Sequence, residues 1–227
     1  VFTTHSQDAV NELPDKSVWA AINKRTWNGK LSIESLRAIT GETPDARAIY
    51  VEDDFTQEWV SNAVGRYAKE IYGTTKVFPA GGYPNCVKVA QFHNENPMLK
   101  VPSVALVDGD IYDVAQGPAL PAHARFIGEG YPESIVFDYI YNNRTEKISI
   151  IRQRCLLTPF DEQKILQAIE SVRNSACDPH VIFRELSNRL SFASVLHIRA
   201  GMIDVFNEAN AEFWHELIEF IRENTAP

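Results

Sequence analysis

Long apolar runs, paired cysteines and targeting signals are scarce in this 227-residue sequence. No apolar stretch approaches the roughly 18 residues of a membrane-spanning helix, so we expect no membrane partner. Cys86, Cys155 and Cys177 are scattered and form no CxxC pair. This pattern argues against a zinc site and favours reduced thiols in a cytoplasmic protein. The first residues contain neither a basic segment before an apolar one nor an Arg-rich stretch, so export is not expected.

Positive charge is scarce as well. The chain has 22 Lys and Arg against 30 Asp and Glu, which gives a net charge of −8 and a pI near 5.3. A protein that binds nucleic acid through phosphate contacts usually presents a basic face, so the overall charge argues against DNA binding. Divalent cations held by a carboxylate cluster would reverse that charge locally. Hydrophobic residues make up 44% of the chain, which is typical of a soluble globular protein.

The centre of the chain alternates between short apolar segments and longer amphipathic ones. Phe55–Tyr72 has an apolar residue at every fourth position, which predicts a helix that ends before Gly73. Val101–Val107 is nearly all apolar, as expected for a strand buried on both faces of a sheet. Together the segments predict an α/β fold with a mainly parallel sheet and flanking helices. The predicted strands are Ala46–Val51, Lys76–Ala80, Val101–Val107 and Ala124–Ile127, and the predicted helices are Phe55–Tyr72 and Asn85–Asn94.

From Pro132 onward only helical periodicity is present, so we expect an all-helical C-terminal subdomain. Upstream of the α/β segment, Trp19–Trp27 is typical of a strand or a short amphipathic piece, followed by a turn at Asn28-Gly29. The predicted domains are 1–45, 46–130 and 131–227. The predicted helices of the last domain are Pro132–Tyr141, Lys147–Cys155, Pro159–Val172, Pro179–Arg189, Ala193–Phe206 and Ala211–Glu223.

Two acidic clusters each follow a predicted strand. Glu52-Asp53-Asp54 comes after the first strand, and Asp108-Gly109-Asp110 comes after the third. Because ligand sites in open α/β sheets form outside the carboxyl ends of the strands, we expect both clusters to face one crevice. Carboxylates gathered there repel one another unless hard divalent cations bind between them, and Mg²⁺ suits such oxygen ligands. The alternative is that they are polar loop tips, with Asp53 or Asp54 capping the following helix.

The same residues resemble a known catalytic family. The segments IYVEDD, VFPAGGY and VPSVALVDGDIYD resemble a Toprim domain, a Rossmann-like fold with a glutamate after its first strand and an Asp-x-Asp after a later one. By this resemblance, Glu52, Asp108 and Asp110 bind two divalent ions, Mg²⁺ or Mn²⁺, that drive DNA cleavage. The usual family glycine after the glutamate is replaced here by Asp53. That departure is similar to the overcoming-lysogenisation-defect (OLD) family of ATPase-nucleases, in which acidic residues follow the glutamate.

The first six residues extend the resemblance. VFTTHS resembles the last strand and switch-histidine loop of an ABC-type ATPase, in which the histidine contacts the γ-phosphate of ATP. OLD proteins join such an ATPase to a Toprim domain. The resemblance therefore implies that residues 1–45 are the tail of an ATPase domain and a linker. It also implies that His5 acts on ATP only in the full-length protein, which self-associates through its ATPase part. SACDPHVIFRELSNRL resembles OLD C-terminal regions.

Weaker candidates lie outside these motifs. Glu133 opens a predicted helix after Pro132 and is either a further metal ligand or a partner of the helix dipole. Arg184, Arg189 and Arg199 have a spacing that fits either a basic DNA-binding strip or a solvated helix face.

Two further features have local explanations. Gly81-Gly82 either allows the backbone to approach a phosphate or makes a strand-to-helix turn. His180 follows Asp178-Pro179, which is typical of a helix start, so a capping context accounts for it. The remaining isolated histidines are expected at the surface or in the core.

Together with the Toprim resemblance, the acidic clusters lead us to expect a metal-dependent nuclease that hydrolyses DNA phosphodiesters with two ions. Glu52 is expected to be a ligand or the general base, Asp108 to bridge both ions, and Asp110 to bind one of them. Hydrolysis is favoured over rejoining because no tyrosine is placed to act as a covalent nucleophile. Two alternatives remain. One is a receiver-like signalling domain that binds Mg²⁺, and the other is an inactive Toprim-fold domain used for binding or dimerisation.

Overall fold

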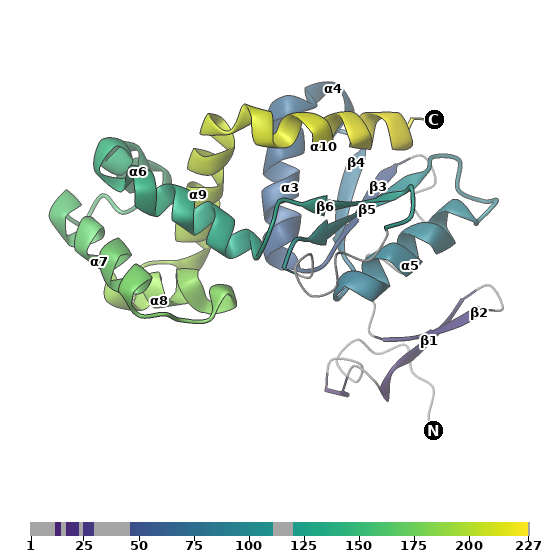
Figure 1. Cartoon of the computed structure of the whole chain (residues 1–227), viewed down its shortest axis with the longest axis horizontal. Helices are drawn as coiled ribbons and strands as arrows, with labels where there is room; N and C mark the ends of the chain where they lie inside the picture. The colour runs from purple at the N-terminus through teal and green to yellow at the C-terminus, as the bar shows by residue number, and fades with distance from the viewer. Residues whose placement is uncertain (1–11, 15–16, 23–24, 30–45, 111–119, 227) are drawn as a thin grey trace.

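A computed structural model describes residues 12–14, 17–22, 25–29, 46–110 and 120–226 of the chain. Its centre is a four-stranded sheet in the order β4-β3-β5-β6, in which every neighbouring pair is parallel (Figure 1). The strands are β3 (Arg47–Val51), β4 (Thr75–Pro79), β5 (Ser103–Asp108) and β6 (Ala124–Ile127). The prediction of an α/β fold with a parallel sheet is confirmed.

Ahead of this sheet, β1 (Trp19–Ile22) and β2 (Arg25–Asn28) pair in an antiparallel fashion. Gly29 N donates to Val18 O at 2.9 Å, next to the paired strand ends. The sequence predicted one strand or amphipathic piece over Trp19–Trp27, so two separate strands are a correction. Neither Gly nor Pro divides that stretch, so its composition did not indicate two strands.

Helices cover both faces of the parallel sheet. α3 (Asp54–Tyr67) packs on one face and α5 (Tyr83–Asn94) on the other. Successive residues of a strand point to opposite faces. Accordingly, Ile49 of β3 belongs to the large core with Trp59 of α3, whereas the next residue, Tyr50, belongs to the smaller core under α5. The sheet is thereby buried on both sides, as the apolar composition of β5 predicted.

The predicted helix Phe55–Tyr72 is interrupted at Ala68. This residue has φ −136° and ψ 51°, which ends α3, and α4 (Lys69–Tyr72) begins directly after it. The apolar spacing continues across the break, because Ala68 and Ile71 are both buried. Periodicity alone therefore predicted one helix where the chain forms two.

Residues beyond Pro132 are helical, as predicted. One correction is that α6 is a single helix of 23 residues. Two helices, separated at residues 142–146, were predicted there. Polar side chains of this stretch contact the preceding turn of the same helix. Asn143 Nδ2 donates to Tyr139 O at 2.8 Å, and the Arg144 guanidinium lies 4.0 Å from the Tyr141 ring centre. The elements are α6 (Pro132–Arg154), α7 (Glu162–Asn174), the 3₁₀ helix η3 (Pro179–Val181), α8 (Ile182–Arg189), α9 (Val195–Ala209) and α10 (Ala211–Asn224). Among the described helices, none combines the length and apolar composition that crossing a bilayer requires.

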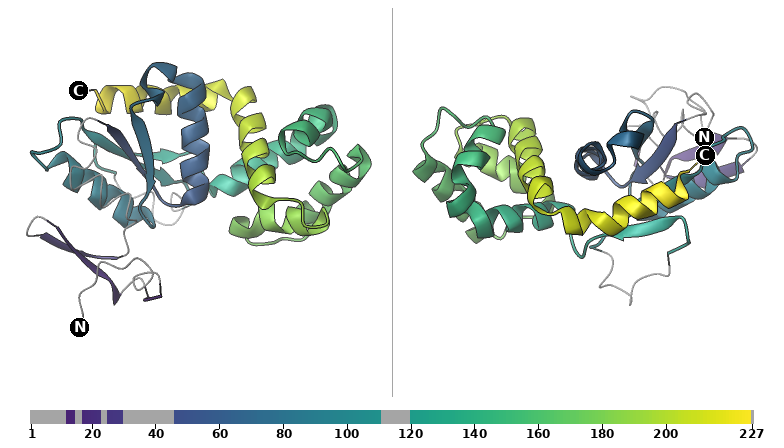
Figure 2. Two further views of the ribbon diagram at one scale, coloured as in Figure 1. Left: turned by 180° about the vertical axis from the view of Figure 1, so that it is seen from behind. Right: turned by 90° about the horizontal axis from the view of Figure 1, so that it is seen from above.

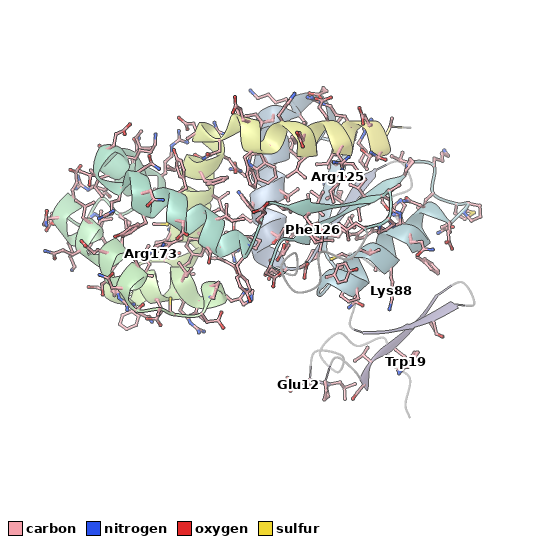
Figure 3. All side chains as sticks on the ribbon, viewed as in Figure 1. Glu12, Trp19, Lys88, Arg125, Phe126 and Arg173 are labelled. Atoms are coloured by element: carbon pink, nitrogen blue, oxygen red, sulfur yellow. The ribbon has the colours of Figure 1, made fainter. Side chains whose placement is uncertain are left out.

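The last helix, α10, returns to the sheet, while α6 to α9 gather at the other end of the molecule (Figure 1, Figure 2). The guanidinium of Arg125 on β6, labelled in Figure 3, lies 4.9 Å from the ring centre of Phe220 on α10. Arg222 donates to Tyr67 O at 2.9 Å. The apolar core of the tail is continuous with one face of the sheet, so the domain boundary at residue 130 stays a prediction.

Asn207 of α9 is fully buried and connects α9 with α3 and α10. Its Oδ1 accepts from the indole N–H of Trp59 at 2.9 Å and from that of Trp214 at 2.8 Å. Its Nδ2 donates to Trp59 O at 3.2 Å and to Asn62 Oδ1 at 2.8 Å. We call these four residues the Asn207 centre. Since both polar atoms of the amide have two partners, its burial leaves no hydrogen bond unmade.

Candidate metal centre

The carboxyl edge of the sheet carries both acidic clusters. Glu52 directly follows β3, and Asp108 is the last residue of the adjacent strand β5. Glu52 Oε1 accepts from Asp108 N at 3.0 Å, so the two clusters that the sequence assigned to one crevice are in contact. This bond also fixes the end of the strand that carries Asp108.

Asp108 is almost enclosed, with 6% of its surface exposed. Burial, followed by the carboxylates of Glu52 and Asp53, raises the pKa of Asp108 to about 8 from an ordinary value of 3.8. The Thr56 hydroxyl donates to Asp108 Oδ1 at 3.0 Å and opposes this rise. Burial also raises the pKa of Glu52 to about 7, against the opposing effect of the Asp108 and Tyr83 amides. In the absence of a cation, both carboxyl groups therefore take up protons close to neutral pH.

Thr56 links two acids of the cluster from the first turn of α3. Its backbone N donates to Asp53 Oδ1 at 2.9 Å, which makes Asp53 the cap of the helix. The capping role foreseen for Asp53 or Asp54 therefore belongs to Asp53, and Asp54 is exposed at the start of the helix. No role was predicted for the fully buried Thr56, because a capping pattern does not reveal where a first-turn hydroxyl points.

Glu133 reaches the same cluster from the first turn of α6 and is 4% exposed. His180 Nδ1 lies 3.0 Å from Glu133 Oε1, and its ring meets the Tyr131 ring edge-on at 5.4 Å. Burial raises the pKa of Glu133, and the bond to Glu133 raises the pKa of His180. The sequence explained His180 by local capping, and Asp178 does cap η3 through His180 N. The contact with Glu133 spans 47 positions and left no local signal.

Three glycines shape the edge of the sheet. A Cβ on Gly109 would lie 2.3 Å from Gly128 O, so a larger residue at position 109 would push apart the ends of β5 and β6. Gly81 and Gly82 have φ of +82° and +94°, and their amides donate to Glu52 O at 3.0 and 3.4 Å. These two glycines therefore make the strand-to-helix turn, the second of the two roles that the sequence allowed.

The other predicted residues lie around this cluster or away from it. Asp110 is half-buried after β5 and contributes to the raised pKa of Glu52. Arg189 NH1 bonds to Glu185 Oε2 at 2.7 Å, and Arg199 Nε bonds to Glu58 Oε2 at 2.5 Å. Arg184 is exposed on α8, so the basic strip stays a prediction. His5 lies outside the described residues.

The donor set suits divalent cations. Carboxylates come from the β3–α3 turn, from the end of β5 and from α6, and an imidazole comes from η3. The ligand atoms of Asp53, Glu133 and His180 all lie within 4.8 Å of one another. Oxygen donors are those that Mg²⁺ and Mn²⁺ prefer, and the enclosed carboxyl groups lose their protons when a cation binds. The residues present therefore fit such an ion.

No family model, no curated protein and no solved structure matches the chain. The geometry of the acidic cluster therefore carries the functional conclusion.

Proposed function

We propose that the chain is a Mg²⁺- or Mn²⁺-dependent nuclease that hydrolyses DNA phosphodiesters. In this proposal the α/β region is a Toprim domain, and the chain is the C-terminal part of an OLD-type ATPase-nuclease. The observation that carries the proposal is the meeting of Glu52, Asp108 and Glu133, which three separate elements bring to the carboxyl edge of a parallel sheet.

The energetics of the cluster support this proposal. Burying carboxyl groups beside one another destabilises the folded chain, because each charged form loses its hydration and repels the others. The pKa of Asp108, raised to about 8, reflects that cost. A cation removes it by attracting the same charges, so we expect the cluster to serve ion binding rather than folding.

We assign the ion-holding residues from the Toprim resemblance and from their place at the carboxyl edge of the sheet. Glu52, Asp108 and Asp110 would hold one ion, and Asp53 and Glu133 would contribute to a second. Bound divalent ions supply a water of lowered pKa and neutralise charge on the scissile phosphate. Thr56 orients Asp108 through its hydroxyl.

A plasmid-nicking assay in Mg²⁺, Mn²⁺ and EDTA tests the proposal. We expect cleavage with either metal and none in EDTA. Asp108→Ala should lower the rate by more than about 100-fold, the upper range seen when outer partners of a metal are removed. Asp138→Ala is the matched control, because the Asp138 side chain forms an ion pair with Arg173 of α7 rather than with a residue of the acidic cluster. Parental activity in Asp108→Ala would refute the site. Metal binding without cleavage would favour the receiver-like or inactive binding domain.

A further inference from the structure

One corner of the acidic cluster contains a nitrogen donor. The ligand atoms of Asp53, Glu133 and His180 lie within 4.8 Å of one another, and they come from the β3–α3 turn, the first turn of α6 and η3. We call these three residues the mixed triad. The other acids of the cluster, Glu52, Asp108 and Asp110, offer only oxygen.

The imidazole of the mixed triad is anchored on two sides. Asp178 caps η3 by accepting from His180 N at 2.9 Å, which fixes the backbone, and the Tyr131 ring packs edge-on against the imidazole at 5.4 Å. The side chain of His180 remains 54% exposed, whereas that of Glu133 is 6% exposed. An ion arriving from solvent therefore meets an oriented nitrogen backed by an enclosed carboxylate.

An ion pair between His180 and Glu133 does not explain why Asp53, the third residue of the mixed triad, lies close to both. Asp53 uses Oδ1 to cap α3, and a carboxylate has a second oxygen to offer. Its position within ligand distance of both partners is what an ion shared by three side chains requires.

We propose that the mixed triad selects a first-row transition-metal ion, such as Mn²⁺, over Mg²⁺, while the all-oxygen group takes either ion. The proposal rests on the nuclease function proposed above and makes its two metal positions chemically unequal. Imidazole is a good ligand for transition metals, whereas Mg²⁺ prefers oxygen and keeps several of its waters.

Electron paramagnetic resonance of bound Mn²⁺ tests the proposal directly, since echo-modulation spectra report a ¹⁴N nucleus bonded to the metal. The wild-type chain should show that coupling. In His180→Gln the coupling should vanish, and Mn²⁺ affinity by titration calorimetry should fall about 10- to 100-fold, while Mg²⁺ affinity changes less than about two-fold. His215→Gln, at an exposed position on α10, is the control and should behave as the wild type.

A second variant keeps the test valid if His180→Gln folds poorly. Asp53→Asn retains the capacity to cap α3, because Asn is as good a cap as Asp. It should weaken Mn²⁺ binding while the ¹⁴N coupling persists. The proposal is overturned if coupling persists in a folded His180→Gln chain, if the wild type shows none, or if Asp53→Asn binds Mn²⁺ as tightly as the wild type.

The same samples separate this proposal from the nuclease function. If the wild-type chain binds Mn²⁺ with nitrogen coupling but does not nick plasmid, the metal site at the mixed triad is supported and the nuclease function is contradicted. If the chain nicks plasmid but shows no nitrogen coupling, the nuclease function is supported and the metal site at the mixed triad is contradicted.

Discussion

Two buried polar centres in this molecule differ in how well their groups are matched. In the Asn207 centre, the amide oxygen accepts from two indole N–H groups and the amide nitrogen donates to two oxygens. In the acidic cluster, Asp108 is buried too, but its strongest electrostatic neighbours are the carboxylates of Glu52 and Asp53. A matched centre stabilises the fold, whereas a mismatched one destabilises it until a ligand arrives.

Breaking the matched centre should have the largest effect. Asn207→Leu leaves the indole N–H groups of Trp59 and Trp214 buried without an acceptor, so we expect the free energy of unfolding to fall by about 3 kcal/mol. Urea denaturation measures it. Asn188→Leu, on the exposed side of α8, is the control and should change stability by less than about 0.5 kcal/mol. A neutral Asn207→Leu would mean that the hydrogen bonds of the centre contribute nothing.

Removing a carboxyl group from the acidic cluster should raise the free energy of unfolding, the opposite of the effect of Asn207→Leu. The pKa of Asp108 is about 8 in the folded chain against an ordinary 3.8, so the folded state holds a proton that the unfolded state has released. In EDTA the free energy of unfolding should therefore fall as pH rises from about 4 to about 8. Asp108→Asn should remove much of that slope and be more stable at pH 8 by roughly 2 kcal/mol. If stability depended on pH equally in Asp108→Asn and in the wild type, the raised pKa of Asp108 would be contradicted.

Thr56 combines features of both centres, because its hydroxyl bond to Asp108 contributes to the fold and would orient a ligand of the proposed metal site. Thr56→Val should destabilise the chain by about 1.5 kcal/mol and weaken binding of Mn²⁺ measured by calorimetry. Thr56→Ser keeps the hydroxyl and should recover most of the metal affinity even though it loses a methyl group. If Val and Ser variants bound Mn²⁺ equally well, the hydroxyl would have no part in positioning Asp108.

The smallest effect concerns DNA. The chain has a net charge of −8, and loading two divalent ions would offset four negative charges at the acidic cluster. A gel-shift series should give about five-fold tighter binding in Ca²⁺ than in EDTA, or roughly 1 kcal/mol. The salt dependence should be shallow because few phosphates are neutralised. Equal affinity in Ca²⁺ and EDTA would indicate that a basic surface such as the strip of Arg184, Arg189 and Arg199 holds the DNA.

The sequence predicted those features that depend on short stretches of chain. Each strand of the parallel sheet was found because its apolar run is short and an acidic residue or a glycine follows within two residues. The meeting of Glu52 with Asp108 followed from the rule that parallel strands share one carboxyl edge. The domain division and the functional roles of these residues stay predictions.

Features that depend on tertiary contacts were missed. His180 and Glu133 are 47 positions apart, and no local pattern relates them. The break at Ala68 preserves the apolar spacing, and the polar stretch 142–146 interrupts it without ending α6. In both cases periodicity records which side of a segment is buried, and it does not record where the backbone turns.

Gly109 has a consequence for how this sequence varies among relatives. Its missing side chain lets the end of β5 pass beside Gly128 O, where a Cβ would come within 2.3 Å. Selection for folding alone should therefore keep a glycine there, even in relatives that lack the proposed metal site. In such relatives Asp108 and Glu133 should both be replaced by neutral residues, while the glycine at position 109 is retained. Joint loss of the two acids beside a retained glycine would mark a relative that kept the sheet without the proposed metal site.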